Sequence, residues 1–420
     1  MGESNSSSSS NSSNSRHLSR LIKSCFPNPS TDVLPTITNA TSVSVAPTPT
    51  TTTTISSLPD DLLLLILSHV PTPSLPHLPS VCRRWSLLLL SPSFPNLHRL
   101  LHPLRPSLLL LSPSSSLSCL VPLPSPHPIP IPIPTRSLSP PILTSLPHAR
   151  LVSLGPHAFL ISPSRSFLFD SLTLTLTPRS PMLTPRKNFA SASLSGKIYV
   201  AGGKTSPPST VEEYDPGSDS WRVVASSSRG RYGCVGAAAD GVFYVIGGLR
   251  FGGGREAHVY ASSMDLYDVE AGVWLRSRSV PGGGCVVGAC STEEGFVYVL
   301  ASHAVESSFW RFDGRRRKGR KGGGGGRGGF GEWRRMKSPP MPAQVRLDAT
   351  VKFGCVAVGE EVAVVQVGGC IDDLLRRSGR SGRGLRGGLL LVYHTISGEW
   401  SRGSDLPGVM SRALCTSVFC

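Results

Sequence analysis

Pairs of cysteines are the first residues in this chain whose type and spacing could support chemistry. Cys285 and Cys290 are separated by four residues, and so are Cys415 and Cys420. A thiolate metal site needs further ligands at matching spacing, and neither pair has them. The ten cysteines are scattered and include no Cys-x-x-Cys pair. We therefore expect buried core thiols, a reducing compartment and no metal site.

One histidine pair has the spacing of metal ligands on a helix. His98 and His102 are four positions apart, but Arg99 stands where a zinc protease needs its glutamate. We interpret this stretch as the frayed end of a helical segment. The chain also lacks a nucleophile elbow, a P-loop and paired acids in a catalytic context. The sequence predicts no catalytic residue and no cofactor.

The net charge of +16 is concentrated in two short segments. Residues 315–335 carry nine Lys or Arg and one acid, and residues 376–386 carry five Arg. Together they hold 13 of the 16 net charges. Because the rest of the chain is nearly balanced, we expect no specific nucleic-acid partner. No run of eighteen apolar residues exists, so no membrane span is predicted.

The basic, glycine-rich insertion at 314–332 has two interpretations. It separates Phe312 from Trp333, which favours a solvated loop between two strands. The alternative is an arginine–glycine RNA-binding segment or a nuclear localisation signal, and an exposed loop is compatible with such a signal. We expect the protein in the nucleus, the cytoplasm or both. The candidate nuclear signal consists of Arg315, Arg316, Arg317, Lys318, Arg320 and Lys321.

The most helix-like stretch of the chain is residues 58–101. Pro59 suits a first helical turn, and Asp60 complements the positive end of the helix dipole. Six aliphatic residues, 62–67, follow before Pro71 ends the element.

A second helical pattern follows, with Val81, Trp85 and Leu88 spaced to share one face. A unit of about forty residues cannot bury this much apolar surface by itself. Some of that surface is therefore expected to face a partner.

Three motifs in this stretch resemble an F-box: Leu58-Pro59-Asp60-Asp61, Val81-Cys82-Arg83-Arg84-Trp85 and Ser91-Pro92-Ser93-Phe94. The resemblance implies docking on the Skp-type adaptor of an SCF ubiquitin ligase, and through it on cullin and RING subunits. The adaptor contacts that the resemblance implies are Leu58, Pro59, Leu62, Leu63, Ile66, Leu67, Val81 and Trp85.

A repeat begins at about residue 150, and one recurring piece is an apolar strand that follows a glycine. Copies lie at 196–203, 241–248, 295–302 and 359–369. Three of them close on a glycine pair, which permits close backbone approach at a strand end. These pairs are Gly202 and Gly203, Gly247 and Gly248, and Gly368 and Gly369.

The other recurring piece is an aromatic residue followed seven positions later by Trp. Phe312 begins a copy that the insertion interrupts before Trp333, and Phe169 begins one that has Leu176 in place of Trp. Aromatic residues at a fixed interval are expected to pack between neighbouring units. The complete copies are Tyr214 and Trp221, Tyr267 and Trp274, and Tyr393 and Trp400.

Units of about 45–65 residues with alternating strands and glycine-rich turns predict a β-propeller. The glycine pair with spaced Tyr and Trp resembles the kelch repeat. The expected fold is α+β multidomain: a small helical domain, then an all-β kelch-type propeller of about five to six blades, some degenerate. The predicted boundaries are 1–57 for a disordered tail, 58–101 for the F-box, 102–149 for a linker or degenerate first blade, and 150–420 for the propeller, with an Arg/Gly loop at 376–388.

Three segments outside the clear repeats carry separate predictions. Residues 128–134, in which proline alternates with isoleucine, are expected to be an extended or edge segment. Residues 412–420 are expected to close the ring as a strand against the first blade. The Ser-rich tail matches a myristoylation pattern, but a transit peptide and a phosphorylatable tail are also compatible with it.

The resemblance as a whole is to F-box/kelch-repeat proteins, and it implies a non-catalytic substrate receptor of an SCF ligase. The propeller would hold an unknown protein target. Two alternatives stay open: a scaffold unconnected to ubiquitin, and a propeller enzyme such as a copper oxidase. Tyr199, Tyr244 and Tyr298 would be the candidates in such an oxidase, but each occupies the same repeat position, which favours packing.

Overall fold

The computed structural model divides the chain into two units, residues 1–57 and 58–420. Of the first unit it describes only 54–57, which include η1 (Ile55–Ser57), so the tail predictions lie outside the described residues apart from these four. The described residues are 54–102, 104–112, 118–123, 128–131, 148–172, 175–203, 209–227, 230–251, 259–303, 306–316, 331–341, 352–368, 388–406 and 413–419.

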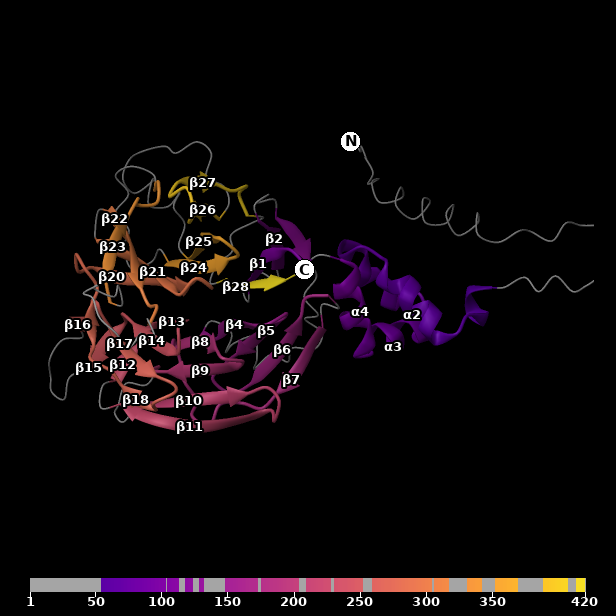
Figure 1. The fold of residues 1–420 in the computed structure, drawn as a ribbon, viewed down its shortest axis with the longest axis horizontal. Helices are drawn as coiled ribbons and strands as arrows, with labels where there is room; N and C mark the ends of the chain where they lie inside the picture. The colour runs from indigo at the N-terminus through magenta and orange to yellow at the C-terminus, as the bar shows by residue number, and fades with distance from the viewer. Residues whose placement is uncertain are drawn as a thin grey trace, which may run out of the picture. The chain divides into compact units, whose positions relative to one another are not determined.

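Residues 60–101 fold into three α-helices and a 3-10 helix, drawn in indigo in Figure 1. None of the described helices is long and apolar enough to cross a membrane. Asp60 and Asp61 lie in the first turn of the first helix, as predicted, whereas Pro59 stands at the N-cap position, one residue before the predicted first turn. The helices are α2 (Asp60–Ser68), η2 (Thr72–Ser80), α3 (Arg83–Leu89) and α4 (Ser93–Leu101).

The described strands form six main antiparallel sheets, which are the blades of a β-propeller (Figure 1). Blade 1 combines both ends of the β region: β28 (Leu414–Phe419), β1 (Pro106–Leu111), β2 (Ser118–Pro122) and β3 (Ile129–Ile131). Blade 2 contains β4 (Arg150–Leu154), β5 (His157–Ile161), β6 (Ser166–Asp170) and β7 (Thr175–Arg179). Blade 3 contains β8 (Ala190–Leu194), β9 (Lys197–Ala201), β10 (Ser209–Asp215) and β11 (Ser220–Ser227).

Blades 4 to 6 follow the same plan, with small additions to blade 4. Blade 4 contains β13 (Val235–Ala239), β14 (Val242–Ile246), β17 (Ser263–Asp268), β18 (Val273–Trp274) and β19 (Arg278–Ser279). Blade 5 contains β20 (Cys285–Ser291), β21 (Phe296–His303), β22 (Glu306–Asp313) and β23 (Trp333–Met336). Blade 6 contains β24 (Lys352–Val358), β25 (Glu361–Gly368), β26 (Leu390–His394) and β27 (Trp400–Arg402). A small separate sheet consists of β12 (Gly230–Tyr232), β15 (Leu249–Phe251) and β16 (Val259–Tyr260).

The inner strands close a ring. Each inner strand contacts the next in the order β28, β4, β8, β13, β20, β24 and back to β28. The closure itself is the antiparallel pairing of β28 with β1, which places Leu414 opposite Leu111 and Phe419 opposite Pro106. The prediction that the final segment closes the ring is therefore confirmed, and the blade count is six.

Apolar side chains from neighbouring blades interleave to form the core. One cluster joins blades 5 and 6 through Tyr298, Phe309, Val364 and Tyr393. Another joins blades 2 and 3. Because each blade covers the face of the next, the repeated strands bury both of their surfaces only when the ring is complete.

The predicted linker region contributes β1, β2 and β3 to blade 1. Its proline-rich part supplies β3 at the outer edge of the sheet. Because no described strand pairs with the outer side of β3, the missing backbone N–H of Pro130 is tolerated there. The insertion at 314–332 falls in the sequence between β22 and β23, which pair in blade 5, so its predicted position between two strands is confirmed; of its residues, 317–330 lie outside the described part of the chain. The predicted Arg/Gly loop at 376–388 lies outside the described residues except for Gly388.

Candidate functional sites

An exposed apolar face runs along α2. The side chains of Leu62, Leu65 and Ile66 are 50%, 41% and 51% exposed, which is unusual for three neighbouring aliphatic residues. Their spacing of three and four residues places them together on one side of the helix. Val81, which precedes α3, is a further exposed aliphatic residue. We call Leu62, Leu65 and Ile66 the α2 face.

The opposite side of α2 forms the core of the helical region. Leu63 and Leu67 are each only 1% exposed and pack with Leu75, Leu89 and Phe94. Trp85 is partly buried against the same cluster. Successive helix residues are rotated by about 100°, so adjacent leucines can face opposite environments. Their burial assigns Leu63 and Leu67 to this core, and their expected role as adaptor contacts stays a prediction.

Arg84 links the two sequence motifs of the helical region. Its Nε donates to Asp60 Oδ1 at 2.7 Å, and its Nη2 donates to the carbonyl oxygen of Leu58 at 2.5 Å. Leu58 is half-buried, whereas Pro59 is exposed beside the start of α2. The arginine of the second motif therefore fixes the chain where it enters the first helix.

The histidine pair is not the frayed end that its sequence suggested. His98 is fully buried, and its Nε2 lies 3.0 Å from the carbonyl oxygen of Val70. The Nε2 atom of His102 lies 3.0 Å from the carbonyl oxygen of Ser68, and the two imidazole rings stack. These carbonyls lie at and just beyond the end of α2, where backbone acceptors lack helical donors. The two histidines thus join α4 to the end of α2.

The spaced aromatic residues of the propeller are cross-strand partners. Tyr214 pairs directly with Trp221, and their ring centroids are 5.0 Å apart. Tyr267 with Trp274 and Tyr393 with Trp400 repeat the arrangement at 5.4 and 5.1 Å. The seven-residue interval is therefore the span of a hairpin between the third and fourth strands of a blade. Phe312 and Trp333 still pair despite the insertion between them.

The same tryptophans also bond to the preceding blade. The indole Nε1 of Trp221 donates to the carbonyl oxygen of Ser180, which follows blade 2, at 2.8 Å. Trp274 donates to Ser226 of blade 3 at 3.0 Å, and Trp400 donates to Lys337, which follows blade 5, at 2.7 Å. Each tryptophan therefore joins its own blade to the one before it.

The glycine pairs occupy backbone positions that other residues strain to adopt. Gly202, Gly203, Gly247 and Gly248 all have φ between 67° and 83°. A Cβ on Gly247 would lie 2.6 Å from the Cβ of Val286 in the next blade. Gly368 ends β25, and Gly369 lies outside the described residues.

A cavity of about 880 Å³ lies along the centre of the propeller. Its walls are the inner strands of all six blades, and most of the lining side chains are Gly, Ala, Ser, Val and Cys. Cavities of this volume accommodate small molecules or a protruding part of a larger partner. In the described part of the chain, no group of three or more His, Cys, Asp or Glu side chains is placed to hold a metal ion.

Comparison with known proteins agrees with both parts of this architecture. The F-box domain family matches residues 55–97, and the Kelch motif family matches residues 185–228. The F-box/kelch-repeat protein At5g26960 of Arabidopsis thaliana is 53% identical over 417 residues, which cover 96% of this chain and 98% of that protein. The chain belongs to the F-box/kelch-repeat family.

More distant relatives carry the same description over shorter spans. The F-box/kelch-repeat protein At1g67480 of Arabidopsis thaliana is 27% identical over 54% of this chain and 62% of its own length. The F-box/kelch-repeat protein OR23 of the same plant is 30% identical over 48% of this chain and 55% of its own length.

Two buried arginines of the kelch propeller are not predicted by the sequence patterns. Arg186 donates to Gly202 O at 2.9 Å and to Glu212 Oε1 at 2.8 Å. Arg231 donates to Gly247 O at 3.0 Å and to Asp265 Oδ2 at 2.7 Å. Each guanidinium thus ties the first glycine of a pair to an acid on the third strand of the same blade.

A shared spacing identifies these arginines in retrospect. Arg186 and Arg231 each stand four residues before the first strand of their blade, and each acid stands two residues before the repeated Tyr. Aligning the repeats on their Tyr and glycine pair would have found both. Their role is to hold the glycine turn against the third strand.

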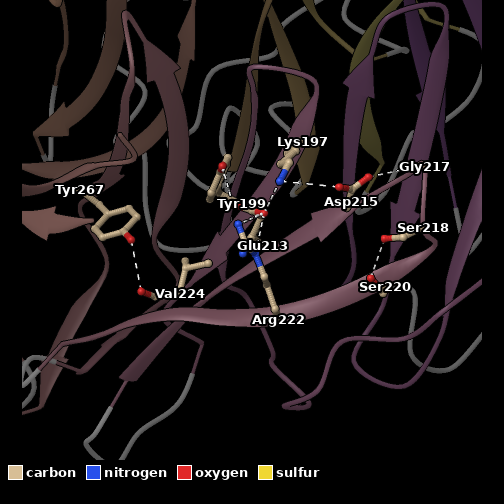
Figure 2. Close-up of polar contacts among 10 residues, drawn as sticks. All are labelled: Lys197, Tyr199, Glu213, Asp215, Gly217, Ser218, Ser220, Arg222, Val224 and Tyr267. Atoms are coloured by element: carbon tan, nitrogen blue, oxygen red, sulfur yellow. Dashed lines mark hydrogen bonds and ion pairs between the residues drawn. The ribbon is translucent and has the colours of Figure 1, made fainter. Parts of the chain in front are cut away.

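A second polar cluster lies on blade 3 of the kelch propeller (Figure 2). The carboxylate of Glu213 accepts hydrogen bonds from Lys197 Nζ at 2.7 Å, Tyr199 OH at 2.7 Å and Arg222 Nε at 2.9 Å. Burial disfavours the charged carboxylate, but these donors outweigh it and hold the pKa of Glu213 below its ordinary value. The hydroxyl of Tyr199 is therefore occupied, in agreement with a packing role.

The candidate nuclear signal is only partly described. Arg315 pairs with Asp313 at 2.8 Å, and Arg316 pairs with Asp268 at 2.7 Å. These two arginines therefore anchor the start of the insertion to the propeller. The remaining signal residues, Arg317, Lys318, Arg320 and Lys321, lie outside the described residues.

Proposed function

We propose that this protein is the substrate-recognition subunit of an SCF-type ubiquitin ligase. The F-box docks on a Skp-type adaptor, and through it on cullin and RING subunits, while the kelch propeller holds a protein target. The protein contributes proximity between the ligase and target lysines rather than bond chemistry. Membership of the F-box/kelch-repeat family and the presence of both modules support this role.

The observation that carries the proposal is the exposed α2 face. The helical core is filled by Leu63, Leu67 and their neighbours, so Leu62 and Ile66 are not needed to complete it. Exposed aliphatic side chains in contiguous positions mark protein interfaces. Because Leu62 and Ile66 are already about half buried, completing the burial of one of them contributes roughly half of the 1.5–3 kcal/mol that a fully exposed aliphatic side chain gains.

A pull-down with purified Skp-type adaptor tests the docking step. Ile66→Asp places a charge on the α2 face and is expected to weaken adaptor binding by roughly tenfold to a hundredfold or more. The matched control is Ile396→Asp, because Ile396 is 79% exposed on a turn of the propeller. The double change of Leu58 and Pro59 to alanine provides a second disruption. Adaptor binding that survives both F-box changes would exclude this docking mode.

The protein target can be sought by affinity purification. The intact chain and the Ile66→Asp variant are expressed with and without a proteasome inhibitor. A target of the ligase is expected to accumulate on the intact chain when the proteasome is blocked, and to be ubiquitinated only when the α2 face is intact. Targets that bind without any change in ubiquitination would favour the scaffold alternative.

We also propose that the basic insertion directs part of the protein to the nucleus, with the rest in the cytoplasm. The basic run and its position in the sequence between β22 and β23, the last two strands of blade 5, support this proposal. A fluorescent fusion in which Arg317, Lys318, Arg320 and Lys321 are changed to Gln is expected to lose nuclear signal. An unchanged distribution would reject the signal.

A further inference from the structure

We call the end of the central cavity at which the inner strands begin its mouth. Loop residues line the cavity there, including Asn188 before β8, Gly233 before β13 and Gly248 after β14. At the opposite end the described lining stops within the strands, at Ser153, Ser291 and Ser417. A ligand that enters from the mouth therefore meets loop residues first and the strands afterwards.

Arg150 is the one arginine or lysine among the described residues that line this cavity. No aspartate or glutamate is among the described lining residues. Arg150 begins β4, and its guanidinium makes no ion pair with any residue that the structure describes. Among the described lining residues, the cavity therefore carries a positive charge near its mouth and no carboxylate that balances it.

The surroundings of Arg150 fix its guanidinium without neutralising it. Nε donates to Phe189 O at 2.7 Å, Nη1 to Ala149 O at 3.1 Å and Nη2 to Cys234 O at 3.4 Å. The group also lies over the ring of Phe189, with 5.7 Å between the guanidinium carbon and the ring centroid. A guanidinium has five N–H donors, so two are left for a ligand. Burial lowers the pKa of Arg150, which reflects the poor solvation of its charge.

Two fully buried arginines of the propeller show what the half-buried Arg150 lacks. Arg186 is paired with Glu212 and Arg231 with Asp265, both at short distance inside a blade. A buried charge without an opposite charge is unfavourable. The protein supplies an acidic partner for Arg186 and Arg231, and we expect the partner of Arg150 to come from a ligand in the cavity.

The remaining polar groups of the cavity suit a ligand rich in acceptors. Ser153 and Ser417 bring their hydroxyl oxygens within 3.2 Å of each other on neighbouring inner strands. Hydroxyls can donate to a carboxylate or phosphate oxygen. The small side chains of the walls leave the volume open for the rest of a small molecule.

We propose that the central cavity of the propeller binds a small organic anion whose carboxylate or phosphate group pairs with Arg150. This site is independent of the ubiquitin role, because it requires neither the F-box nor the adaptor. Loss of adaptor binding and loss of anion binding are separate measurements, so the two proposals fail separately.

Calorimetry and thermal unfolding of the full chain test the site with succinate and inorganic phosphate, at constant ionic strength. Succinamide serves as the neutral analogue of succinate. Succinate or phosphate is expected to bind the unaltered protein and raise its unfolding temperature, and succinamide is not. Arg150→Gln is expected to raise the dissociation constant at least tenfold. Arg165→Gln removes the same charge from an exposed turn outside the cavity and is expected to bind like the unaltered protein.

Three outcomes would overturn the proposal. The first is equal binding of succinate and succinamide, and the second is equal binding of an anion by the Arg150→Gln variant and the unaltered protein. The third is that neither anion binds detectably at concentrations up to 10 mM, which corresponds to a binding free energy weaker than about 3 kcal/mol. Arg150→Lys keeps the charge and is expected to retain a preference for succinate over succinamide. If Arg150→Gln does not fold, the lysine variant and the unaltered protein decide the question through that preference.

Discussion

At the scale of single residues, each repeated tryptophan makes two contacts of different kinds. Its ring packs on an aromatic partner across the hairpin, and its indole N–H bonds to a carbonyl of the preceding blade. The ring contact holds a blade together, whereas the hydrogen bond holds two blades together. Trp333 has the first contact with Phe312, and no indole hydrogen bond to a described residue.

This difference allows the hydrogen bond to be measured. Trp221→Phe keeps an aromatic ring opposite Tyr214 but leaves the carbonyl of Ser180 without its donor. The free energy of unfolding is expected to fall by about 1–2 kcal/mol. Trp333→Phe also removes part of an indole ring but no such bond to a described residue, so the fall in the free energy of unfolding is expected to be about 1 kcal/mol smaller. Urea unfolding of both variants checks this, and equal losses would contradict it.

The Glu213 carboxylate makes stability depend on pH. Its folded-state pKa lies below the ordinary value of 4.5, so the carboxylate favours the folded state. This contribution is complete above about pH 4.5 and is lost as the pH falls through the lower folded pKa. Glu213→Gln removes it at every pH. Urea unfolding between pH 7 and 3 is expected to show that the free energy of unfolding falls less steeply towards low pH in the variant than in the unaltered protein. An equal pH dependence of the two proteins below about pH 5 would contradict this.

At the scale of elements, the glycine pairs let the second strand of one blade end in close contact with the next blade. Gly247 and Gly272 both have positive φ, of 67° and 70°. The space around them differs, because a Cβ at Gly247 meets Val286 at 2.6 Å and one at Gly272 meets nothing within 4 Å. The two positions therefore separate backbone strain from crowding.

Alanine at each position is expected to reveal that difference. Gly272→Ala should lower the free energy of unfolding by about 1–2 kcal/mol, from the left-handed backbone alone. Gly247→Ala should lose a further 1–3 kcal/mol or so, because blade 5 must move to admit the methyl group. Thermal unfolding of the pair checks the prediction. A smaller fall in the free energy of unfolding for Gly247→Ala than for Gly272→Ala would show that blade 5 admits the methyl group at little cost.

At the scale of the molecule, the propeller depends on one pairing between distant segments. β28 supplies the inner strand of blade 1, and the other three strands of that blade come from residues 106–131. Leu108, Leu109 and Leu110 of β1 are fully buried. Without β28, these side chains and the neighbouring inner strands β24 and β4 lose a partner.

Deletion of residues 413–420 is therefore expected to open the ring. The variant should lose its single cooperative unfolding transition and become sensitive to brief proteolysis. Ser417→Ala, which keeps the backbone pairing, is the control and should behave like the unaltered protein. A truncated chain that still unfolds in one transition at the same temperature would show that the ring does not need this strand.

The amino-acid sequence by itself determined the architecture, because its signals are local. The Leu58-Pro59-Asp60-Asp61 motif, the glycine pairs and the Tyr-to-Trp interval each reflect one turn, one helix start or one hairpin. Such features depend on neighbouring residues and on a fixed period. For the same reason the interrupted interval from Phe312 to Trp333 is enough to place the insertion at 314–332 between two strands.

Only the tertiary structure decided which residues face outward and which are paired. Leu62 and Leu63 are adjacent and chemically identical, yet one is exposed and the other buried, since the fold determines which side of α2 meets α3 and α4. Arg186 and Arg150 look alike in the sequence, but Arg186 pairs with Glu212, whereas Arg150 lines the central cavity. Burial and charge pairing depend on segments far apart in the chain, which local patterns do not encode.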